Sequence, residues 1–246
     1  SINDNRLINI KGQNKGISNA LNLGIDNANG LYIARMDSDD ISYFDRIKIQ
    51  LNYLLTNNLD ICGSNYRTFG NESSLIYFPE KNEDILFSLL FTTPIAHPTL
   101  FIKSKILKTF KYSANIKAAE DLDLWMKLAM NDYKFGNCQE VLLNYRSHNA
   151  QGSKTTLIQD EVCIYLSSNY AKYYFNSPLK DDYINHKCCY LKLYSIDQIF
   201  LLLNALYNEL IFRNLSNNNL KRITASLFFR VKNYNYKTLN IYLKLL

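Results

Sequence analysis

The chain has 246 residues, of which 47% are hydrophobic, and this composition excludes an intrinsically disordered protein. Its length allows one full domain and a smaller appendage. A net charge of +6 fits an anionic substrate or an anionic membrane surface. The sequence contains no dense block of Lys and Arg and no RNA-binding aromatic motif, so we do not expect nucleic acid as a partner.

The cysteines and the apolar runs indicate the cellular setting. The five cysteines are odd in number and none forms a C-x-x-C pair, which disfavours a zinc site or a disulfide framework. A reducing cytoplasm is the simplest setting for such a chain. The longest apolar run, from Ile199 to Leu206, is too short to span a bilayer.

The first forty residues predict a strand, a helix, a second strand and an acidic turn. Residues 6–11 are β-prone, and a turn at 14–16 separates them from a helical pattern over 17–28. Residues 31–36 form a short apolar strand, and the cluster Asp37-Ser38-Asp39-Asp40 follows it directly.

A second helix is predicted after the acidic turn, with Ser42 as its N-cap and an end at Asn57-Asn58. Its expected buried stripe comprises Phe44, Ile47, Leu51, Leu54 and Leu55. A strand over 60–66 follows. This alternation of strands and helices predicts an α/β fold with a largely parallel sheet and helices on both faces.

Elements alternate less regularly in the middle of the chain. The elements expected there are helices over 84–91 and 120–131 and strands over 99–103 and 141–146. His97 lies in the loop before the first of these strands, and His148 lies just beyond the end of the second.

Long helical patterns dominate from about residue 155 onward. We therefore expect a first domain over residues 1–155 and a helical C-terminal region over residues 156–246. An apolar stripe within 199–211, followed by scattered Lys and Arg residues, would suit peripheral contact with an anionic membrane. The alternative is that this stripe packs on the first domain or on a second subunit.

The acidic turn carries the first chemical signal. Asp37 and Asp39 are two residues apart, a spacing that points both carboxylates the same way in extended backbone. Clustered carboxylates repel one another unless a cation neutralises them, and oxygen ligands suit Mn²⁺ or Mg²⁺ completed by substrate phosphates. The alternative is a capping cluster ahead of the next helix.

A second acidic pair, Glu120 and Asp121, opens a predicted helix. The helix dipole favours ionised carboxylates at this end, and an ionised carboxylate in a cleft can act as general base for a hydroxyl group. The alternative is ordinary charge at the start of a helix.

Taken in order, four segments resemble the family 2 inverting glycosyltransferases. These segments are NKGISNALNLGIDNANGLYIARMDSDD at 14–40, HPT at 97–99, AEDLDLW at 119–125 and YRSH at 145–148. The resemblance implies a GT-A fold, which is Rossmann-like with a mixed, mostly parallel sheet and flanking helices. It also implies a nucleotide-diphosphate sugar as donor, usually linked to uridine diphosphate, and a divalent metal ion.

The resemblance also implies roles for single residues. Asp37 and Asp39 match the D-x-D motif that binds the metal ion and the donor phosphates, and Asp40 assists. Asp121 matches the acidic residue taken as catalytic base, and Glu120 beside it contacts the acceptor. The acceptor hydroxyl would attack the anomeric carbon opposite the leaving group, which inverts the configuration.

Three further residues have two interpretations each. Lys15 could reach the donor phosphates or be a solvated turn lysine. His148 could be a further metal or phosphate ligand, supported by Arg146, or a loop histidine with an ordinary hydrogen bond. His97 could line the acceptor side of the cleft or merely fill its loop.

Members of this family begin with a strand, a helix and a second strand that ends in an aspartate holding the nucleoside base. The sequence ahead of Asn3 contains none of these, so we expect a GT-A domain that lacks its first βαβ unit. The expected function is sugar transfer to a hydroxyl of a glycan or lipid-linked acceptor in surface polysaccharide synthesis, at or near the inner membrane face. The alternatives are a non-catalytic truncated remnant and another Mg²⁺-dependent enzyme similar to nucleotidyltransferases.

Overall fold

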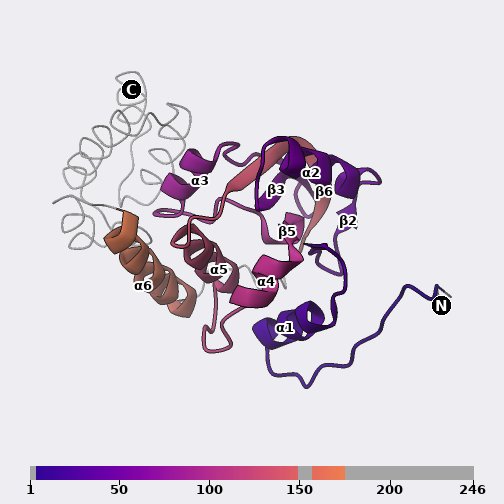
Figure 1. Cartoon of the computed structure of the whole chain (residues 1–246), viewed down its shortest axis with the longest axis horizontal. Coiled ribbons are helices and arrows are strands. Elements are labelled where there is room, and N and C mark those ends of the chain that lie inside the picture. Colours follow the sequence, from indigo (N-terminus) through magenta and orange to yellow (C-terminus); the bar gives the residue numbers. More distant parts are fainter. Residues whose placement is uncertain (1–3, 149–156, 175–246) are drawn as a thin grey trace.

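The structure, a computed structural model, describes residues 4–148 and 157–174, and its centre is a mixed six-stranded sheet (Figure 1). The strands are β1 (Tyr32–Ala34), β2 (Ile41–Ser42), β3 (Ile61–Gly70), β4 (Leu75–Ile76), β5 (Phe101–Lys103) and β6 (Phe135–Ser147). Their order is β1-β5-β3-β6-β2, and β4 pairs with β3 at the side. The first half of β3 is buried at every position, as expected for a strand with neighbours on both sides.

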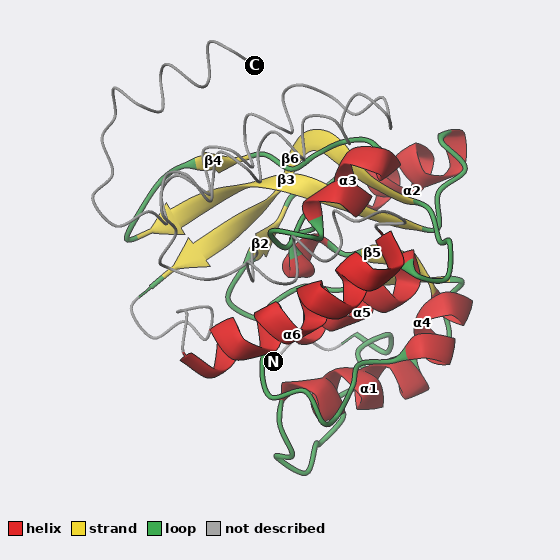
Figure 2. Ribbon diagram, turned by 90° about the vertical axis from the view of Figure 1, so that its left-hand side faces the viewer, coloured by secondary structure: helices red, strands yellow, loops and turns green. Residues whose placement is uncertain are grey.

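The α/β class and the mixed sheet are confirmed, but the expected predominance of parallel strands is wrong for the described residues. Only β3 and β6 are parallel, with a register that runs from Ile61 opposite Phe135 to Gly70 opposite Ser147. Figure 2 shows these two strands side by side as the longest arrows of the sheet. The other four pairings are antiparallel. The alternating pattern could not reveal this, because β2 and β5 are short strands whose partners are set by contacts between distant parts of the chain.

Helices cover both faces of the sheet (Figures 1 and 2). They are α1 (Ile17–Asn27), α2 (Arg46–Thr56), α3 (Asn82–Ser88), α4 (Ser104–Phe110), α5 (Glu120–Ala129) and α6 (Leu157–Tyr174), with a 3-10 turn η1 (His97–Thr99). Neighbouring residues of one strand enter different cores, because side chains alternate along a strand. Ile61 belongs to the main core with α5 and α6, whereas Cys62 joins the smaller core beneath Leu54 of α2.

Most of the predicted elements are present. The helical pattern at 17–28 forms α1, the apolar strand at 31–36 contains β1, and Asn57 caps α2. The strand predicted at 60–66 extends to Gly70, and the one predicted at 141–146 begins already at Phe135. Helix α4 was not predicted.

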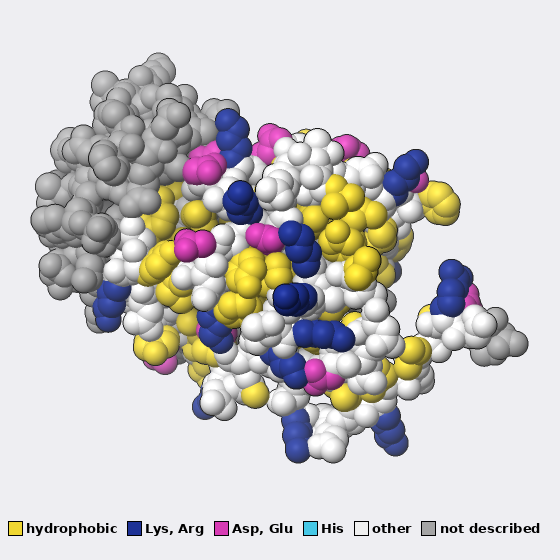
Figure 3. All heavy atoms as spheres, viewed as in Figure 1, with side chains coloured by type: hydrophobic (Ala, Val, Ile, Leu, Met, Phe, Trp, Pro, Cys, Tyr) yellow, Lys and Arg dark blue, Asp and Glu magenta, His cyan; other side chains and the backbone are white. Residues whose placement is uncertain are grey.

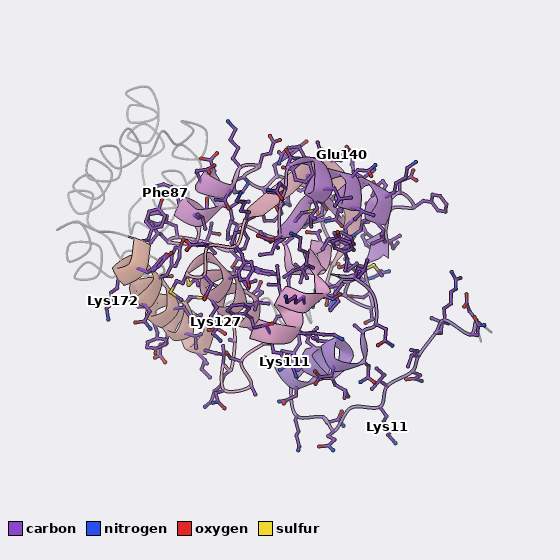
Figure 4. The ribbon with its side chains drawn as sticks, in the orientation of Figure 1. Lys11, Phe87, Lys111, Lys127, Glu140 and Lys172 are labelled. Carbon is purple, nitrogen blue, oxygen red and sulfur yellow. The ribbon has the colours of Figure 1, made fainter. Side chains whose placement is uncertain are left out.

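The strand predicted over residues 6–11 is wrong. These residues have no regular structure, and Leu7, Ile8 and Ile10 are exposed. A strand needs a hydrogen-bonded neighbour, and no described strand pairs with this segment. Figure 4 shows Lys11 on the same segment, standing away from the sheet.

The predicted buried stripe of α2 is also largely wrong. Ser42 lies in β2, the N-cap is Asp45, and Phe44 is 99% exposed. The buried positions of the helix are Arg46, Gln50 and Leu54. Figure 3 shows hydrophobic side chains gathered on the surface over α2 and β2. Apolar periodicity missed the inward face because two of its three buried residues are polar.

Arg46 and Gln50 are buried because backbone carbonyls on two segments satisfy them. The Arg46 guanidinium donates through Nη2 to the Arg35 carbonyl at 2.7 Å and through Nε to Gln50 Oε1 at 2.9 Å. Gln50 Nε2 donates to the Thr99 carbonyl at 2.8 Å. Burial lowers the pKa of Arg46 to about 10, which leaves it charged at neutral pH. This pair therefore joins the end of β1 to the segment that enters β5.

Helix α6 matches the helical pattern predicted after residue 155, and it packs into the main core. Tyr170 and Ala171 are buried there, and the Tyr170 hydroxyl donates to the Leu86 carbonyl at 3.1 Å. Phe87 of α3 lies near Tyr174, at the end of α6 (Figure 4). None of the described helices is long and apolar enough to cross a membrane. The apolar stripe within 199–211 and the basic residues after it lie outside the described residues.

We predict that Arg46→Met lowers the free energy of unfolding substantially. The variant leaves the Arg35 carbonyl and Gln50 Oε1 without their donor, and a buried group without a partner costs about 1–3 kcal/mol. Urea unfolding followed by circular dichroism measures the effect. Lys48→Met is the control, because Lys48 is exposed on the same helix and a surface change stays within about 0.5 kcal/mol. Equal stability of the two variants would contradict the bracing role of Arg46.

Candidate active site

The acidic turn follows β1 directly. The backbone N–H of Arg35 donates to the Leu100 carbonyl at 2.9 Å, which continues the pairing of β1 with β5 beyond the last strand residue. The chain then turns at Ser38 and Asp39. Asp37 and Asp39 are partly exposed, and Asp40 is buried.

Asp37 is held by an arginine from its own strand. The Arg35 guanidinium meets the Asp37 carboxylate through two contacts, Nη1 to Oδ2 at 2.7 Å and Nη2 to Oδ1 at 2.6 Å. This bidentate geometry fixes the carboxylate and neutralises its charge. Arg35 itself is largely buried, and within the described residues its Nε has no hydrogen-bond partner.

Asp39 meets the end of β6. His148 Nε2 lies 3.2 Å from Asp39 Oδ2, and Arg146 Nε donates to the Asp39 carbonyl at 2.9 Å. The pairing of β2 with β6 explains this approach across more than one hundred residues. Asp37 and Asp39 thus contact different partners, because residues 38 and 39 form a turn and not the extended backbone assumed from the spacing.

Asp40 presents an unsatisfied carboxylate oxygen beside this pair. Its Oδ1 accepts the Arg146 backbone N–H at 2.9 Å, while its Oδ2 is buried without a partner among the described residues. Burial, and then the charges of Asp37 and Asp39, raise the pKa of Asp40 to about 6. A bound cation near this turn would relieve the repulsion among the three carboxylates.

The donor set fits a divalent cation only in part. Asp39 and His148 offer two ligands at one point, whereas Asp37 is engaged with Arg35. No group of three or more His, Cys, Asp or Glu side chains converges around a common point within residues 4–148 and 157–174. A metal ion here would therefore complete its coordination with water or substrate oxygens, as Mg²⁺ and Mn²⁺ commonly do.

The second acidic pair opens α5 as predicted. Ala119 before it has a left-handed backbone, with φ of 57°, which turns the chain sharply into the helix. The Leu122 backbone N–H donates to Asp121 Oδ1 at 2.8 Å. Burial, and then the charge of Glu120, raise the pKa of Asp121 to about 6. Asp121 is therefore a carboxylate that can accept a proton near neutral pH.

His97 lies beside Glu120 and is enclosed by aromatic rings. His97 Nδ1 is 3.9 Å from Glu120 Oε1, and His97 Nε2 is 2.8 Å from the Tyr112 hydroxyl oxygen. The Trp125 ring lies edge-on to the imidazole at 6.3 Å between centroids. Burial lowers the pKa of His97 to about 3, so the ring is neutral at physiological pH.

Arg35 connects the acidic turn with the first turn of α5. Burial sets the direction of the pKa shifts of Asp121 and Asp40, and the positive charge of Arg35 opposes both shifts. The same charge adds to the effect of burial in lowering the pKa of His97. The two carboxylate groups that the sequence singled out therefore share one electrostatic environment.

Lys15 is not brought to this site by any described contact. It lies in the exposed segment before α1, where its carbonyl accepts a hydrogen bond from the Asn19 side chain at 2.6 Å. Its role in binding donor phosphates stays a prediction. Sequence reasoning missed Arg35, Arg46 and Tyr112. The position of Arg35 two residues before Asp37 was a usable signal, whereas nothing in the sequence marks Tyr112.

Part of the chain matches a known sequence family, and the chain is similar to several known proteins. Residues 3–110 match the sequence family described as Glycosyl transferase family 2. The chain is 35% identical over 162 residues to the O-antigen biosynthesis glycosyltransferase WbnJ of Escherichia coli, and the alignment covers 63% of each protein. It is 35% identical over 153 residues to an uncharacterized glycosyltransferase of Methanocaldococcus jannaschii, which covers 59% of this chain and 52% of that protein.

Among solved structures, S. aureus TarS 1-349 in complex with UDP-GlcNAc is similar, with a TM-score of 0.49 and 16% sequence identity. That comparison covers 86% of this chain and 60% of the TarS chain. The chain thus spans less than two thirds of the length of each of these three proteins.

We predict that Arg35→Met raises the pKa of Asp121 further. The variant removes the positive charge that opposes the effects of burial and of Glu120 on this carboxyl group. Carboxyl ¹³C signals followed over a pH titration measure the change. Arg6→Met is the control, because Arg6 is exposed and its ion pair is with Asp4 in the N-terminal segment. An unchanged Asp121 titration in the Arg35 variant would show that the two groups are not coupled.

Proposed function

We propose that this chain, whose residues 3–110 match the family described as Glycosyl transferase family 2, transfers a sugar from a nucleotide-diphosphate donor to an acceptor hydroxyl group. The observation that carries the proposal is the placement of two carboxylate clusters around Arg35. One cluster, at Asp39 and His148, suits a metal ion with phosphates, and the other contains Asp121, a carboxylate suited to proton transfer. Glu120 and Asp121 lie outside residues 3–110, so their proposed roles rest on their geometry and on the raised pKa of Asp121.

The donor side of the site is assigned to the acidic turn. We assign Asp39 and His148 as ligands of Mn²⁺ or Mg²⁺, with Asp40 completing the negative environment. Asp37 and Arg35 together form the adjoining wall of this side. When bound, the metal ion stabilises the negative charge that develops on the departing nucleotide diphosphate. Uridine diphosphate is the carrier we expect.

The acceptor side is assigned to α5. Asp121 removes the proton of the acceptor hydroxyl as its oxygen attacks the anomeric carbon from the face opposite the leaving group. The bond to the nucleotide diphosphate breaks on the other face, so the configuration inverts. Glu120 contacts the acceptor beside this centre. The name of the E. coli relative supports an acceptor in surface polysaccharide synthesis, either a glycan or a lipid-linked glycan.

The division of the chain is part of the proposal. We assign residues 1–155 to a GT-A domain and residues 156–246 to a helical region. Tyr170 of α6 is buried in the main core, so this helix packs against residues of the first segment. The protein would act in the cytoplasm, with peripheral membrane contact through the C-terminal region as a further proposal.

A donor screen tests the proposed function. The protein is incubated with nucleotide-sugar donors, a glycan acceptor and Mn²⁺ or Mg²⁺, and release of nucleoside diphosphate is measured. Release that depends on the acceptor supports sugar transfer. A product that retains the nucleotide would identify a nucleotidyltransferase instead, and the absence of release with every donor would favour a non-catalytic remnant.

We predict that Mn²⁺ with nucleoside diphosphate raises the melting temperature, and that Asp39→Asn or His148→Ala removes most of this increase. A ligand at about 100 times its Kd stabilises a protein by about 2.7 kcal/mol. Differential scanning fluorimetry with and without the additions measures it. The matched control is Asp45→Asn, because Asp45 makes no side-chain cap to α2. A full shift in both variants would refute the metal assignment.

We also predict that Asp121→Asn lowers kcat by about 100- to 10,000-fold with little change in donor affinity, as removal of a general base does. Calorimetry with the donor separates the two effects. In the unmodified protein, kcat/KM should fall as the pH is lowered through about 6, where Asp121 becomes protonated.

Asp40 also has a pKa raised to about 6, so it needs its own control. Asp40→Asn can still accept the Arg146 N–H, and this variant should keep the acidic limb of the pH profile. Loss of the limb in the Asp40 variant would place the titration at the acidic turn and not at Asp121.

A further inference from the structure

The imidazole of His97 lies between a phenol at one ring nitrogen and a carboxylate at the other. His97 is held at the start of η1, where the Thr99 hydroxyl donates to the Ala96 carbonyl at 2.9 Å. Its Nε2 is 2.8 Å from the Tyr112 hydroxyl oxygen and its Nδ1 is 3.9 Å from Glu120 Oε1. Both ends of the ring therefore have a defined polar neighbour.

Tyr112 is fixed as firmly as the imidazole. It is 4% exposed, and the Asn22 side chain of α1 holds its backbone at both polar groups. Asn22 Nδ2 donates to the Tyr112 carbonyl at 2.8 Å, and the Tyr112 N–H donates to Asn22 Oδ1 at 2.9 Å. Burial raises the pKa of Tyr112, so its hydroxyl keeps its proton at physiological pH.

Two arrangements of protons are available to this neutral ring. Either the Tyr112 O–H donates to Nε2 and the proton of the ring is on Nδ1, or Nε2–H donates to the tyrosine oxygen and Nδ1 is bare. The second arrangement points a lone pair at the Glu120 carboxylate, which is electrostatically unfavourable. The first points an N–H at the same carboxylate, and this attraction selects it.

We propose that Tyr112 and His97 are positioning residues that orient Glu120 through an Nδ1–H donor, so that Glu120 faces the acceptor beside the Asp121 base. This inference rests on the proposed function for the roles of Glu120 and Asp121. The distance of 3.9 Å is longer than a hydrogen bond, and polar contacts of this kind tighten when substrate closes an active site. Trp125 encloses the ring edge-on and keeps water away from it.

The arrangement gives the buried His97 a role as hydrogen-bond donor that does not require it to act as a base. Burial lowers its pKa to about 3, so His97 does not take up a second ring proton near neutral pH. A permanently neutral imidazole with one fixed N–H is a directional donor. A donor of this kind orients a carboxylate without adding a second positive charge next to Arg35, whose charge already acts on His97.

The direct test is ¹⁵N NMR of histidine-labelled protein, in which protonated and bare ring nitrogens give separate signals. The sequence contains three histidines, and the signals lost in His97→Gln assign that ring. We expect a protonated Nδ1 and a bare Nε2 in the unmodified protein. Glu120→Ala removes the carboxylate that favours Nδ1–H and should move the ring toward the other tautomer. A protonated Nε2 in the unmodified protein overturns the proposal.

Activity provides the second readout. Tyr112→Phe should lower kcat by about 10- to 100-fold, as misorientation of a reacting group does, with the donor KM unchanged. Tyr170→Phe is the matched control, because it also removes one buried tyrosine hydroxyl with a hydrogen bond, to the Leu86 carbonyl in the main core. That control should keep both the His97 tautomer and kcat.

The two readouts separate the two proposals. An unchanged kcat in Tyr112→Phe shows that the ring does not position Glu120 for transfer and overturns the inference. The NMR result requires no substrate. If the unmodified protein shows the expected tautomer but transfers no sugar to any acceptor, the arrangement of the ring stands and the proposed function fails.

Discussion

The geometry of the candidate site depends on the hydrogen bonds that the buried Arg46 guanidinium donates. It donates to the carbonyl of Arg35, at the end of β1, and its partner Gln50 donates to the carbonyl of Thr99. The first carbonyl begins the acidic turn, and the second closes the 3-10 turn that carries His97. Because one helix supplies both donors, the acidic turn and the turn that carries His97 are tied to the same point of the fold.

The charged side chains of the candidate site also interact with one another. Asp37, Asp39 and Asp40 bring three carboxylates together, and α5 adds Glu120 and Asp121. Among the described residues, the positive charges near them include Arg35 and Arg46, which are largely buried, and Arg146 at the end of β6. Such a surplus of negative charge raises the pKa values of the buried carboxyl groups and favours a bound cation.

Much of the fold could be predicted because its helices carry clear apolar periods. Leu122, Trp125 and Leu128 of α5 are fully buried, as their spacing indicated. The same logic failed at α2, where Arg46 and Gln50 occupy the inward face, because periodicity counts apolar residues and cannot see a polar group that backbone carbonyls satisfy. Strand direction also escaped prediction, since pairing partners are set by contacts distant in sequence.

In the candidate site, too, residues that belong to sequence motifs could be predicted, whereas contacts between distant segments could not. The sequence identified Asp39, His148, Glu120 and Asp121 from their order along the chain, and the structure brings Asp39 and His148 into contact. Tyr112 could not be found, because its link to His97 depends on how η1 and the loop after α4 meet in space.

The two aspartates of the D-x-D spacing illustrate the limit most clearly. The prediction that Asp37 and Asp39 point the same way assumed extended backbone, but the chain turns at residues 38 and 39. One carboxylate therefore faces the Arg35 guanidinium and the other faces His148. Two aspartates that are two residues apart in a turn can therefore have different partners, although their side chains are chemically identical. Asp37 is held in a bidentate ion pair, whereas we propose that Asp39 shares a cation with His148.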